Sequence, residues 1–334
     1  MRGARARARF ASNRTAVAGG VVIGLLVLFA LLGPALAAHD ATTSDFVHGV
    51  APRTGLPAGP SATFPLGADR LFRDQLARLA AGARLSLAIA LGATLLSTLL
   101  GAAVGITSGW LEGRQTRVAW PAVVGAIAGA VTALSGWPRA GLALAAAGVL
   151  LSLVTRLPGP RLDVDALLMR FVDVMLAFPF LLLVMALGAA VERSSAAAIL
   201  LTLGFTGWLG TARLLRAKTM QVRAADYVVA SRALGQPTAR VLLEHVLPNV
   251  AGTLVVTASL QVAQMIVADS VLSYLGLGIA PPTPTWGRML FEGQDYYASA
   301  PWLVAAPGAA IVVSVWGFNM LGEGLRDALD PHQA

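Results

Sequence analysis

The sequence predicts an all-α fold, a polytopic bundle of transmembrane helices, and three observations carry this prediction. Of 334 residues, 56% are hydrophobic and only 13% are charged, whereas soluble domains carry about 25% charged residues. The mean hydropathy is +0.70. Eight apolar windows lie between charged or His residues, and a helix needs about 20 apolar residues to cross a bilayer. This composition excludes a soluble enzyme, a disordered chain and a fibrous protein.

The eight predicted spans, in chain order, are residues 15–38, 85–111, 118–138, 140–155, 174–191, 194–212, 246–268 and 296–322. The weakest is 140–155, with 16 residues, which Trp137 and Leu157 would lengthen. A buried helix of a soluble protein explains any one window, but not eight in one chain. The first window also resembles a signal peptide, because it follows an Arg-rich start and ends in small residues. Its 24 residues favour a retained anchor over cleavage.

The basic residues predict the orientation of these spans. With the N-terminus inside, 17 of the 25 Lys and Arg residues fall inside and eight fall outside. Of the acidic residues, nine fall inside and eight outside. An excess of basic residues in cytoplasmic segments is the rule for membrane proteins. We therefore expect both termini in the cytoplasm, and the net charge of +8 requires no nucleic acid.

The spans divide the chain into five segments. These are a cytoplasmic tail (1–14), a first span (15–38), an extracytoplasmic segment (39–83), a transmembrane domain (84–322) and a cytoplasmic tail (323–334). Within the domain, the cytoplasmic loop 213–249 has about 37 residues, which is longer than most connections in compact proteins. This loop therefore needs an explanation beyond that of a linker.

The pattern of the loop predicts two short helices at an angle to each other. Gly235 suits the left-handed position after the first helix, and Pro237 suits the first turn of the second. A Pro248-Asn249 break precedes the next span. Apolar and basic side chains alternate along the loop (Val228, Ala230 and Leu234 with Arg232 and Arg240). One face is thus free to bind a partner; the alternative is a solvated connecting hairpin.

The loop resembles the "EAA" coupling loop of ABC-importer permeases. That pattern has Glu-Ala-Ala, then Gly, and later an apolar residue followed by x-Leu-Pro. It falls here on Val229-Ala230-Ser231, Gly235, His245 and Leu247-Pro248. Val229 replaces the acid, and Ser231 replaces the second Ala. The run His-x-Leu-Pro-Asn at 245–249 is typical of the dipeptide, oligopeptide and nickel branch of these permeases.

Other stretches carry the same resemblance in the same order along nearly the whole chain. They are residues 64–74, 82–87, 163–179, 272–287 and 319–331. Within the first stretch, Phe72 stands where the branch has Gly. The chain departs from the family between about Glu112 and Leu162, where the family has a short loop and six spans in total. We expect a two-span hairpin, at about 115–160, inserted at the periphery of a six-span core of the type I importer fold.

The residues offer no catalytic or metal chemistry. No Walker A motif forms around Lys218, the four His residues lack metal-binding spacing, and the chain has no Cys. Two acids, Asp173 and Asp269, are expected near the ends of spans. A lack of buried acids argues against a proton- or ion-coupled carrier, and a membrane-embedded hydrolase or scaffold would need a polar cluster that the spans lack. Pro179 is expected to kink its span, which makes it a candidate pathway element; the alternative is a proline tolerated near the start of a helix.

The resemblance implies a permease subunit of a binding-protein-dependent, ATP-driven importer in the inner membrane of a prokaryote. It implies four kinds of partner: a homologous second permease subunit, two ABC ATPase subunits, an extracytoplasmic solute-binding protein and membrane lipid. The chain itself would bind no cofactor, because ATP and Mg would be held by the ATPase subunits. The solute would be a peptide, or alternatively nickel or another small solute; an ion-coupled secondary carrier is the alternative from a different class. The residues assigned to ATPase coupling are Asp226, Tyr227, Ala230, Ser231, Arg232, Leu234, Gly235, Arg240, His245 and Pro248.

Overall fold

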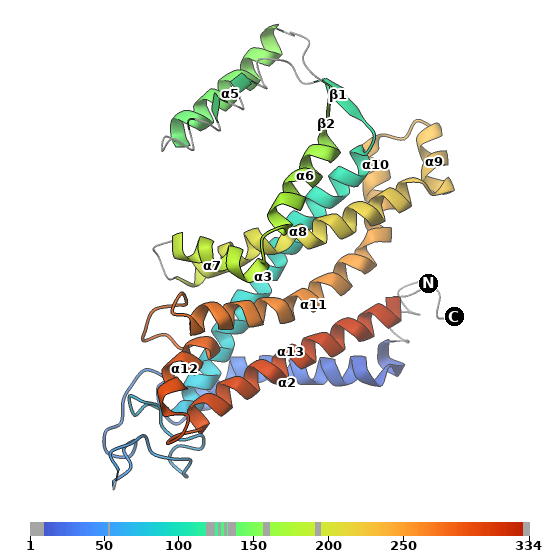
Figure 1. Ribbon diagram of the computed structural model, residues 1–334. Coiled ribbons are helices and arrows are strands. Elements are labelled where there is room, and N and C mark those ends of the chain that lie inside the picture. Colours follow the sequence, from blue (N-terminus) through green and yellow to red (C-terminus); the bar gives the residue numbers. More distant parts are fainter. Residues whose placement is uncertain are drawn as a thin grey trace.

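The computed structural model describes residues 10–52, 54–117, 124–125, 128–129, 132, 138–155, 161–190 and 195–329. Helices make up most of this part of the chain (Figure 1). The long helices are α2 (Arg14–Leu36), α3 (Gln75–Leu111), α5 (Pro138–Thr155), α8 (Ala196–Arg223), α11 (Leu247–Tyr274) and α13 (Trp302–Leu329). The shorter ones are α6 (Val164–Leu176), α7 (Phe180–Ala190), α9 (Asp226–Ala233), α10 (Thr238–Val241), the π-helix η1 (Leu242–Val246), α12 (Trp286–Gly293) and the 3-10 helix η2 (Gln294–Tyr296).

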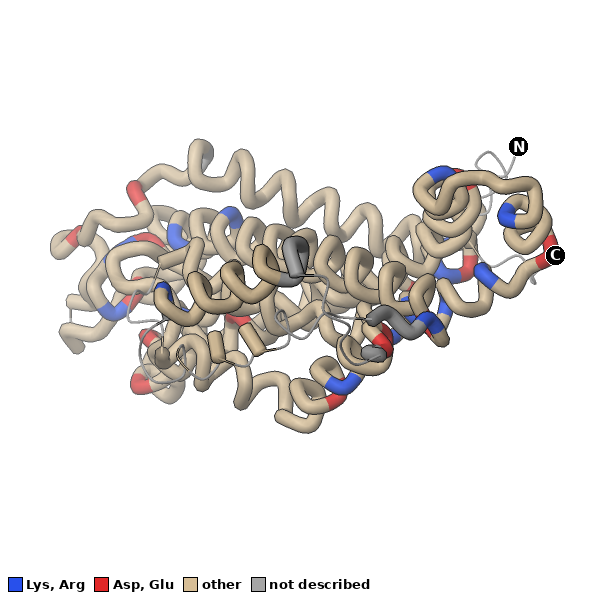
Figure 2. The backbone as a smooth tube through the Cα atoms, turned by 90° about the horizontal axis from the view of Figure 1, so that it is seen from above, with Lys and Arg blue, Asp and Glu red and all other residues tan. Residues whose placement is uncertain are grey.

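Five helices of the described chain are long and apolar enough to cross a membrane. They are α2, α3, α8, the continuous helix Thr238–Tyr274 that ends in α11, and α13. A sixth span results if α6 and α7, which meet at a bend of 88°, are counted together. Six of the eight predicted windows fall on these helices. In Figure 2 the charged residues gather towards the two ends of the bundle, as expected for a protein whose middle lies in lipid.

The other two windows belong to the predicted hairpin, so eight spans are not confirmed. Window 140–155 coincides with α5, but its apolar stretch, Arg139–Leu151, is shorter than a span. Window 118–138 lies almost wholly outside the described residues. Two three-residue strands, β1 (Gln115–Arg117) and β2 (Arg161–Asp163), pair in antiparallel fashion at the base of α5. They add a small β-ribbon to the expected all-α fold.

Several helices extend well past the apolar windows. α3 begins at Gln75, where the Asp74 side chain accepts hydrogen bonds from the Leu76 and Ala77 N–H groups at 2.8 and 3.3 Å. α8 continues to Arg223, and α13 continues to Leu329 through most of the expected C-terminal tail. The windows measure the apolar length that lipid requires, whereas a helix ends only where its backbone is capped. The sequence therefore located the spans better than the helix ends.

Small residues bring the central helices close together. Gly101, Gly105 and Gly109 lie one turn apart on the face of α3 that packs against α8, and a Cβ atom at Gly101 would lie 2.7 Å from Cβ of Thr211. Stripes of small residues of this kind allow helices to approach closely in membranes. Between α3, α8 and α11, the Gln261 amide donates to Ser97 Oγ at 2.7 Å and to the Gly207 carbonyl at 2.8 Å. One buried side chain thus joins three spans.

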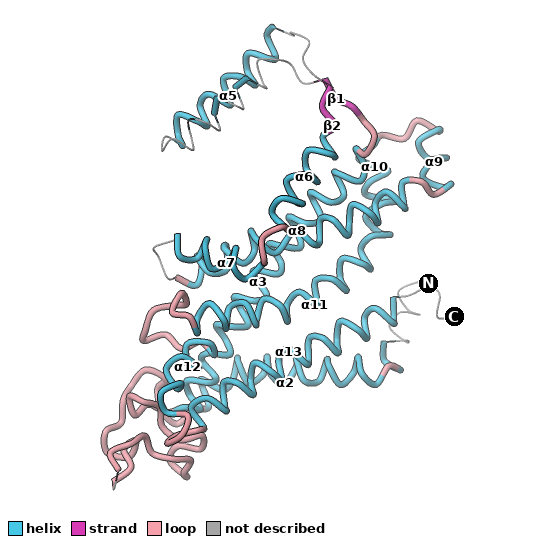
Figure 3. The backbone as a smooth tube through the Cα atoms, viewed as in Figure 1, coloured by secondary structure: helices cyan, strands magenta, loops and turns pink. Residues whose placement is uncertain are grey.

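The segment between α2 and α3, which is predicted to be extracytoplasmic, is largely irregular and lies beside α12 at one end of the bundle (Figure 3). Phe72 adopts a positive φ of 61° there, a backbone conformation that favours Gly. Its ring packs edge-on against Phe46, with the centroids 5.6 Å apart. The Gly expected at position 72 from the resemblance thus corresponds to a left-handed turn that the chain retains with a larger side chain.

Candidate functional site

The predicted coupling loop forms α9 and α10 at the end of the bundle opposite the segment between α2 and α3 (Figure 1). α9 ends in a Schellman motif, in which Gln236 N–H donates to the Ser231 carbonyl at 3.3 Å and Gly235 N–H to the Arg232 carbonyl at 3.0 Å. Gly235 has a φ of 77°, which Gly adopts without the steric penalty of other residues. The local chemistry expected from the sequence therefore sets the turn between the two helices.

The inner face of α9 is anchored to the ends of the long spans. Val228 is fully buried and belongs to an apolar cluster with Trp110, Val246 and Val250. The guanidinium carbon of Arg232 lies 5.5 Å from the centroid of the Trp110 ring. α9 therefore packs on residues of both α3 and α11.

Arg223, at the end of α8, strengthens this junction. It donates to the carbonyls of Trp110 and Glu112, each at 2.9 Å, and its guanidinium lies 2.7 Å from the Glu112 carboxylate. These carbonyls close the last turn of α3, where backbone acceptors lack partners within the helix. One basic side chain thus fixes the end of α3 to the start of the coupling loop.

The outer face of the loop is exposed and partly apolar. Leu234 is 82% exposed at the tip of α9, and Leu243, Val229 and Tyr227 are 63%, 52% and 48% exposed. Large apolar side chains exposed to this extent are typical of a binding site for another protein. Val229 and Leu243 were not among the assigned residues, because their exposure depends on how α9 and η1 are turned.

The assigned residues divide into two groups in the structure. Asp226, Tyr227, Ala230, Arg232, Leu234, Gly235, Arg240 and Pro248 are exposed, whereas Ser231 is buried and His245 is half-buried. Ser231 Oγ donates to the side-chain oxygen of Gln236 at 2.6 Å, and the ring of His245 lies edge-on to Tyr227 at 6.1 Å. Ser231 and Val228 thus hold α9 in place, whereas Asp226, Tyr227 and Ala230 are exposed residues of this helix.

The predicted Pro248-Asn249 break is wrong. The helix runs continuously from Thr238 to Tyr274, with a π-helical turn over 242–246 immediately before the proline. Proline removes one N–H and crowds the carbonyl four residues earlier, and a wider turn accommodates both effects. The Asn249 side chain donates to the His245 carbonyl at 2.6 Å. α10 is therefore joined to α11 through η1, without a break in the helix.

Pro179 lies in the break between α6 and α7, where the chain turns by 88°. This change of direction is larger than the expected kink. The Pro179 carbonyl accepts from Leu183 N–H at 3.0 Å, so the proline caps the start of α7. α6 is held to α8 by Asp165, which accepts from Arg216 Nε at 2.6 Å and from Nη2 at 2.5 Å, and by an ion pair between Asp173 and Arg213.

Asp173 and Asp269 were both expected near the ends of spans, but Asp269 lies in a different environment. Asp173 is exposed at 57% of its side-chain area, but Asp269 is completely buried in α11. Neither carboxylate oxygen of Asp269 has a hydrogen-bond partner among the described residues, and the same holds for Ser273 Oγ one turn later. The expectation that no acid is buried in the spans is therefore wrong at this position.

Comparisons with known proteins agree with these features. Residues 145–334 match a family model described as "Binding-protein-dependent transport system inner membrane component". Residues 2–50 match the "N-terminal TM domain of oligopeptide transport permease C". The chain is similar to the di/tripeptide transport system permease protein DppC of Pseudomonas aeruginosa, with 35% identity over 96% of this chain and 89% of that protein. It is also similar to the oligopeptide transport system permease protein OppC of Bacillus subtilis, with 31% identity over 97% of this chain and 87% of that protein. The OppC protein of Escherichia coli K12 is 31% identical over 98% of this chain and 90% of that protein.

Proposed function

The chain belongs to the family of binding-protein-dependent transport system inner membrane components, and from this premise we propose that it imports short peptides in an ATP-driven complex. It is a multi-pass membrane permease subunit and not itself an enzyme. Relatives named as oligopeptide, dipeptide and di/tripeptide permeases support a peptide substrate. A glutathione permease of Pectobacterium atrosepticum is also similar, and glutathione is itself a small peptide. These names favour peptides over nickel.

The observation that carries the mechanism is the construction of α9, which has a fixed inner face and an exposed apolar outer face. Val228 is fully buried beneath the helix, and Leu234 is 82% exposed at its tip. A segment built in this way transmits movement, because a partner that binds the tip displaces the spans to which the base is fixed. We assign the tip to one of two ATPase subunits, whose closure on ATP would move α9 and, through it, the spans α3 and α11.

The remaining partners and the orientation follow from this assignment. α9 and α10 lie in the cytoplasm, both termini lie on the same side, and the segment 39–83 faces outward to receive a solute-binding protein. A homologous second permease subunit completes the pathway. The break at Pro179 gives α6 and α7 different directions, which suits a span that lines a pathway of changing width.

The inserted segment fits a peripheral position. β1 and β2 pair Gln115 with Asp163 and Arg117 with Arg161, so the chain leaves and re-enters the bundle at neighbouring points. Figure 1 shows α5 standing away from the other helices, and Leu142 and Leu150 of α5 are 72% and 64% exposed. We propose a six-span core with an added hairpin at about 115–160 that contacts lipid.

Cross-linking tests the assignment of α9, since the chain has no native Cys. The complex is reconstituted in proteoliposomes with Ala230→Cys and a single Cys in the docking cleft of the ATPase. We expect a short bifunctional maleimide to link them, with a yield that changes on addition of ATP. Gln221→Cys, an exposed position on α8 outside the tip, is the matched control and should remain unlinked. ATP-dependent uptake of a labelled dipeptide without any link from position 230 would contradict the proposal.

A further inference from the structure

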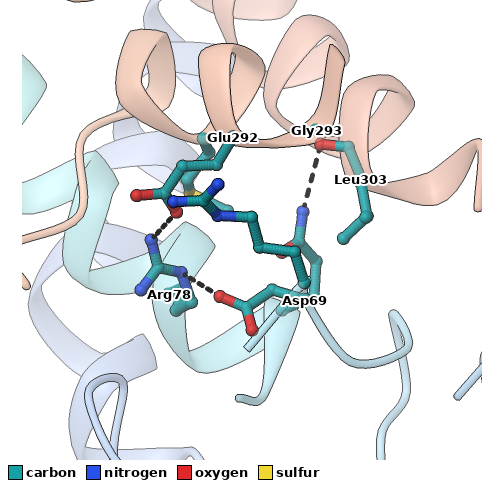
Figure 4. A pocket seen from close by; sticks show the side chains of 8 residues that line it. Asp69, Arg78, Glu292, Gly293 and Leu303 are labelled. Carbon is teal, nitrogen blue, oxygen red and sulfur yellow. Dashed lines mark hydrogen bonds and ion pairs between the residues drawn. The ribbon is translucent and has the colours of Figure 1, made fainter. Parts of the chain in front are cut away.

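A buried network of charges lies at the end of the bundle opposite the coupling loop, and its composition explains it as a structural clamp. Arg73 and Arg78 are 3% and 1% exposed, and they share two carboxylates, Asp69 and Glu292, that are 3% and 6% exposed. Arg78 Nη2 lies 2.7 Å from Glu292, and Arg78 Nε lies 3.1 Å from Asp69. Figure 4 shows Arg78 between these two acids. Two buried cations thus balance two buried anions, and the network fastens the segment before α3 to α3 and α12.

Gln264, well inside α11, has no comparable structural explanation. Its side chain is exposed, and it has no hydrogen-bond partner among the described residues. Gln261, one turn earlier, is buried and joins three spans through its amide. The position of α11 in the bundle therefore depends on Gln261, and the Gln264 amide is free to bind something else.

The large exposed side chains in the middle of other spans differ from Gln264 because they are apolar. They include Leu91, Leu95 and Leu99 on α3 and Val312 on α13. Such side chains suit contact with lipid. An amide without a partner is destabilising in hydrocarbon, so the Gln264 side chain belongs against water or another polar group.

Gln264 shares its face of α11 with Val267 and Tyr274. Successive residues of an α-helix are turned by about 100°, so these three side chains lie within a sector of about 80°. Val267 and Tyr274 are 40% and 43% exposed, and the Tyr274 hydroxyl also lacks a hydrogen-bond partner among the described residues. This face therefore presents free polar groups at two levels, one inside the span and one at its end.

The same helix connects the coupling loop to the bent span that we assign to the pathway. The helix is continuous from Thr238 in α10 to Tyr274, so movement of the coupling loop reaches Gln264 without a break. α7, which follows the bend at Pro179, packs on the other half of α11, where a Cβ atom at Gly188 would lie 3.5 Å from Leu272. A free polar group on this helix is thus well placed to meet a transported solute.

We propose that Gln264 lines the translocation pathway and hydrogen-bonds the backbone of the peptide in transit, an inference that rests on the proposed function. A peptide bond carries one N–H donor and one carbonyl acceptor, and the Gln side chain offers an NH₂ donor and a carbonyl acceptor to match them. The amide is neutral, so it binds peptides without selecting their charge. A charged residue at this position should introduce such a selection.

The first test measures the charge preference of ATP-dependent uptake into proteoliposomes. We compare a cationic and an anionic tripeptide in wild type, Gln264→Glu and Gln264→Lys. Because unlike charges attract and like charges repel, we expect Glu to raise the ratio of cationic to anionic uptake about fivefold, and Lys to lower it to a similar extent. Gln221→Glu, at an exposed position near the end of α8, is the matched control and should keep the wild-type ratio.

A contact between Gln264 and the second permease subunit would change the uptake of both peptides alike. The ratio would then stay at the wild-type value in both Gln264 variants, and this result would overturn the inference. The ratio carries the test because it does not depend on how much transporter assembles. Failure of the wild type to import any peptide would instead overturn the proposed function.

The second test requires no transport and uses the absence of native Cys. Proteoliposomes containing Gln264→Cys are treated with a charged, membrane-impermeant thiol reagent. We expect labelling that a saturating dipeptide slows, whereas Leu95→Cys, at a position 62% exposed on α3, should stay unlabelled because it contacts lipid. Labelling of Gln264→Cys no faster than that of Leu95→Cys would overturn the inference even where peptide uptake is ATP-driven.

Discussion

Arg232 in α9 lies over the ring of Trp110 near the end of α3, with the guanidinium carbon 5.5 Å from the ring centroid. Trp110 is 3% exposed, so the cation rests on a surface that the surrounding side chains hold in place. The contact joins the proposed coupling helix to a span of 37 residues. A force applied to α9 therefore reaches α3 directly.

Loss of this contact should weaken coupling without preventing assembly. A cation over an aromatic ring contributes about 0.5 to 2 kcal/mol, so we expect Arg232→Gln to lower ATP-dependent peptide uptake about threefold, while Arg232→Lys keeps most of it. Arg170→Gln is the matched control. Arg170 lies in α6, is exposed and is not among the residues assigned to coupling, so its loss should cost little. Equal uptake by Arg232→Gln and wild type would remove this contact from the mechanism.

Whether a residue can replace Gly235 should depend on its ability to adopt a positive φ and not on the size of its side chain. A Cβ atom there would meet nothing within 4 Å, but φ is 77°. Asn adopts this conformation more readily than other residues, and a β-branched residue pays about 1 to 2 kcal/mol. Gly235→Asn should thus retain uptake and ATPase attachment, whereas Gly235→Val loses much of both. Pull-down of the ATPase and uptake measure the two effects, and equal behaviour of Asn and Val would show that the turn is unimportant.

The turn at Gly235 was predictable because its cause is local. A left-handed residue and a following proline act within a few positions of the chain, and they left a pattern that could be read without the fold. The windows that fall on the five long apolar helices and on the bent pair α6 and α7 were predictable for a similar reason, since lipid requires about 20 apolar residues in a row. The continuous helix through Pro248 was missed because the π-helical turn that admits the proline leaves no such pattern.

The buried polar groups were not predictable, because they depend on contacts between distant segments. Arg78 and Glu292 are 214 positions apart, and nothing near either residue indicates that they meet. Asp269 was placed near an interface because it lies close to the end of its apolar window, but α12 and its neighbours cover that end. Val229 and Leu243 became visible as surface residues only once the helices carrying them were oriented.

Gln261 should behave as a joint between three spans. Its amide donates to Ser97 of α3 and to the Gly207 carbonyl of α8, and hydrogen bonds between membrane helices contribute about 0.6 to 2 kcal/mol each. We expect Gln261→Leu to lower the Tm of the reconstituted complex by several degrees. Thr257→Val in the same helix is the control, because among the described residues Thr257 donates only to the Thr253 carbonyl of its own helix. A similar Tm for both variants would contradict a special role for Gln261.

Asp269 offers a test between ATP-driven import and ion-coupled transport. A buried carboxylate without a partner is destabilising, so the isosteric Asp269→Asn should keep or raise the Tm. In an ATP-driven importer it should also retain peptide uptake, and a protonophore should have no effect. If Asp269 instead carried a coupling proton, the variant would assemble normally but lose uptake, and the protonophore would abolish wild-type transport. Uptake into proteoliposomes containing ATP, with and without protonophore, separates the two cases.

Removal of the inserted hairpin should leave the transport core working. β1 pairs Gln115 with Asp163, and paired Cα atoms in antiparallel strands lie about 5 Å apart, so a short Gly-Ser linker in place of residues 116–162 closes the gap without moving α3 or α6. We expect this variant to assemble with its partners and to keep at least half of the wild-type uptake. A linker-matched control, with the same Gly-Ser residues inserted between α9 and α10, should reduce uptake because it loosens the coupling loop. Complete loss of transport by an assembled hairpin deletion would show that the insertion belongs to the transport core.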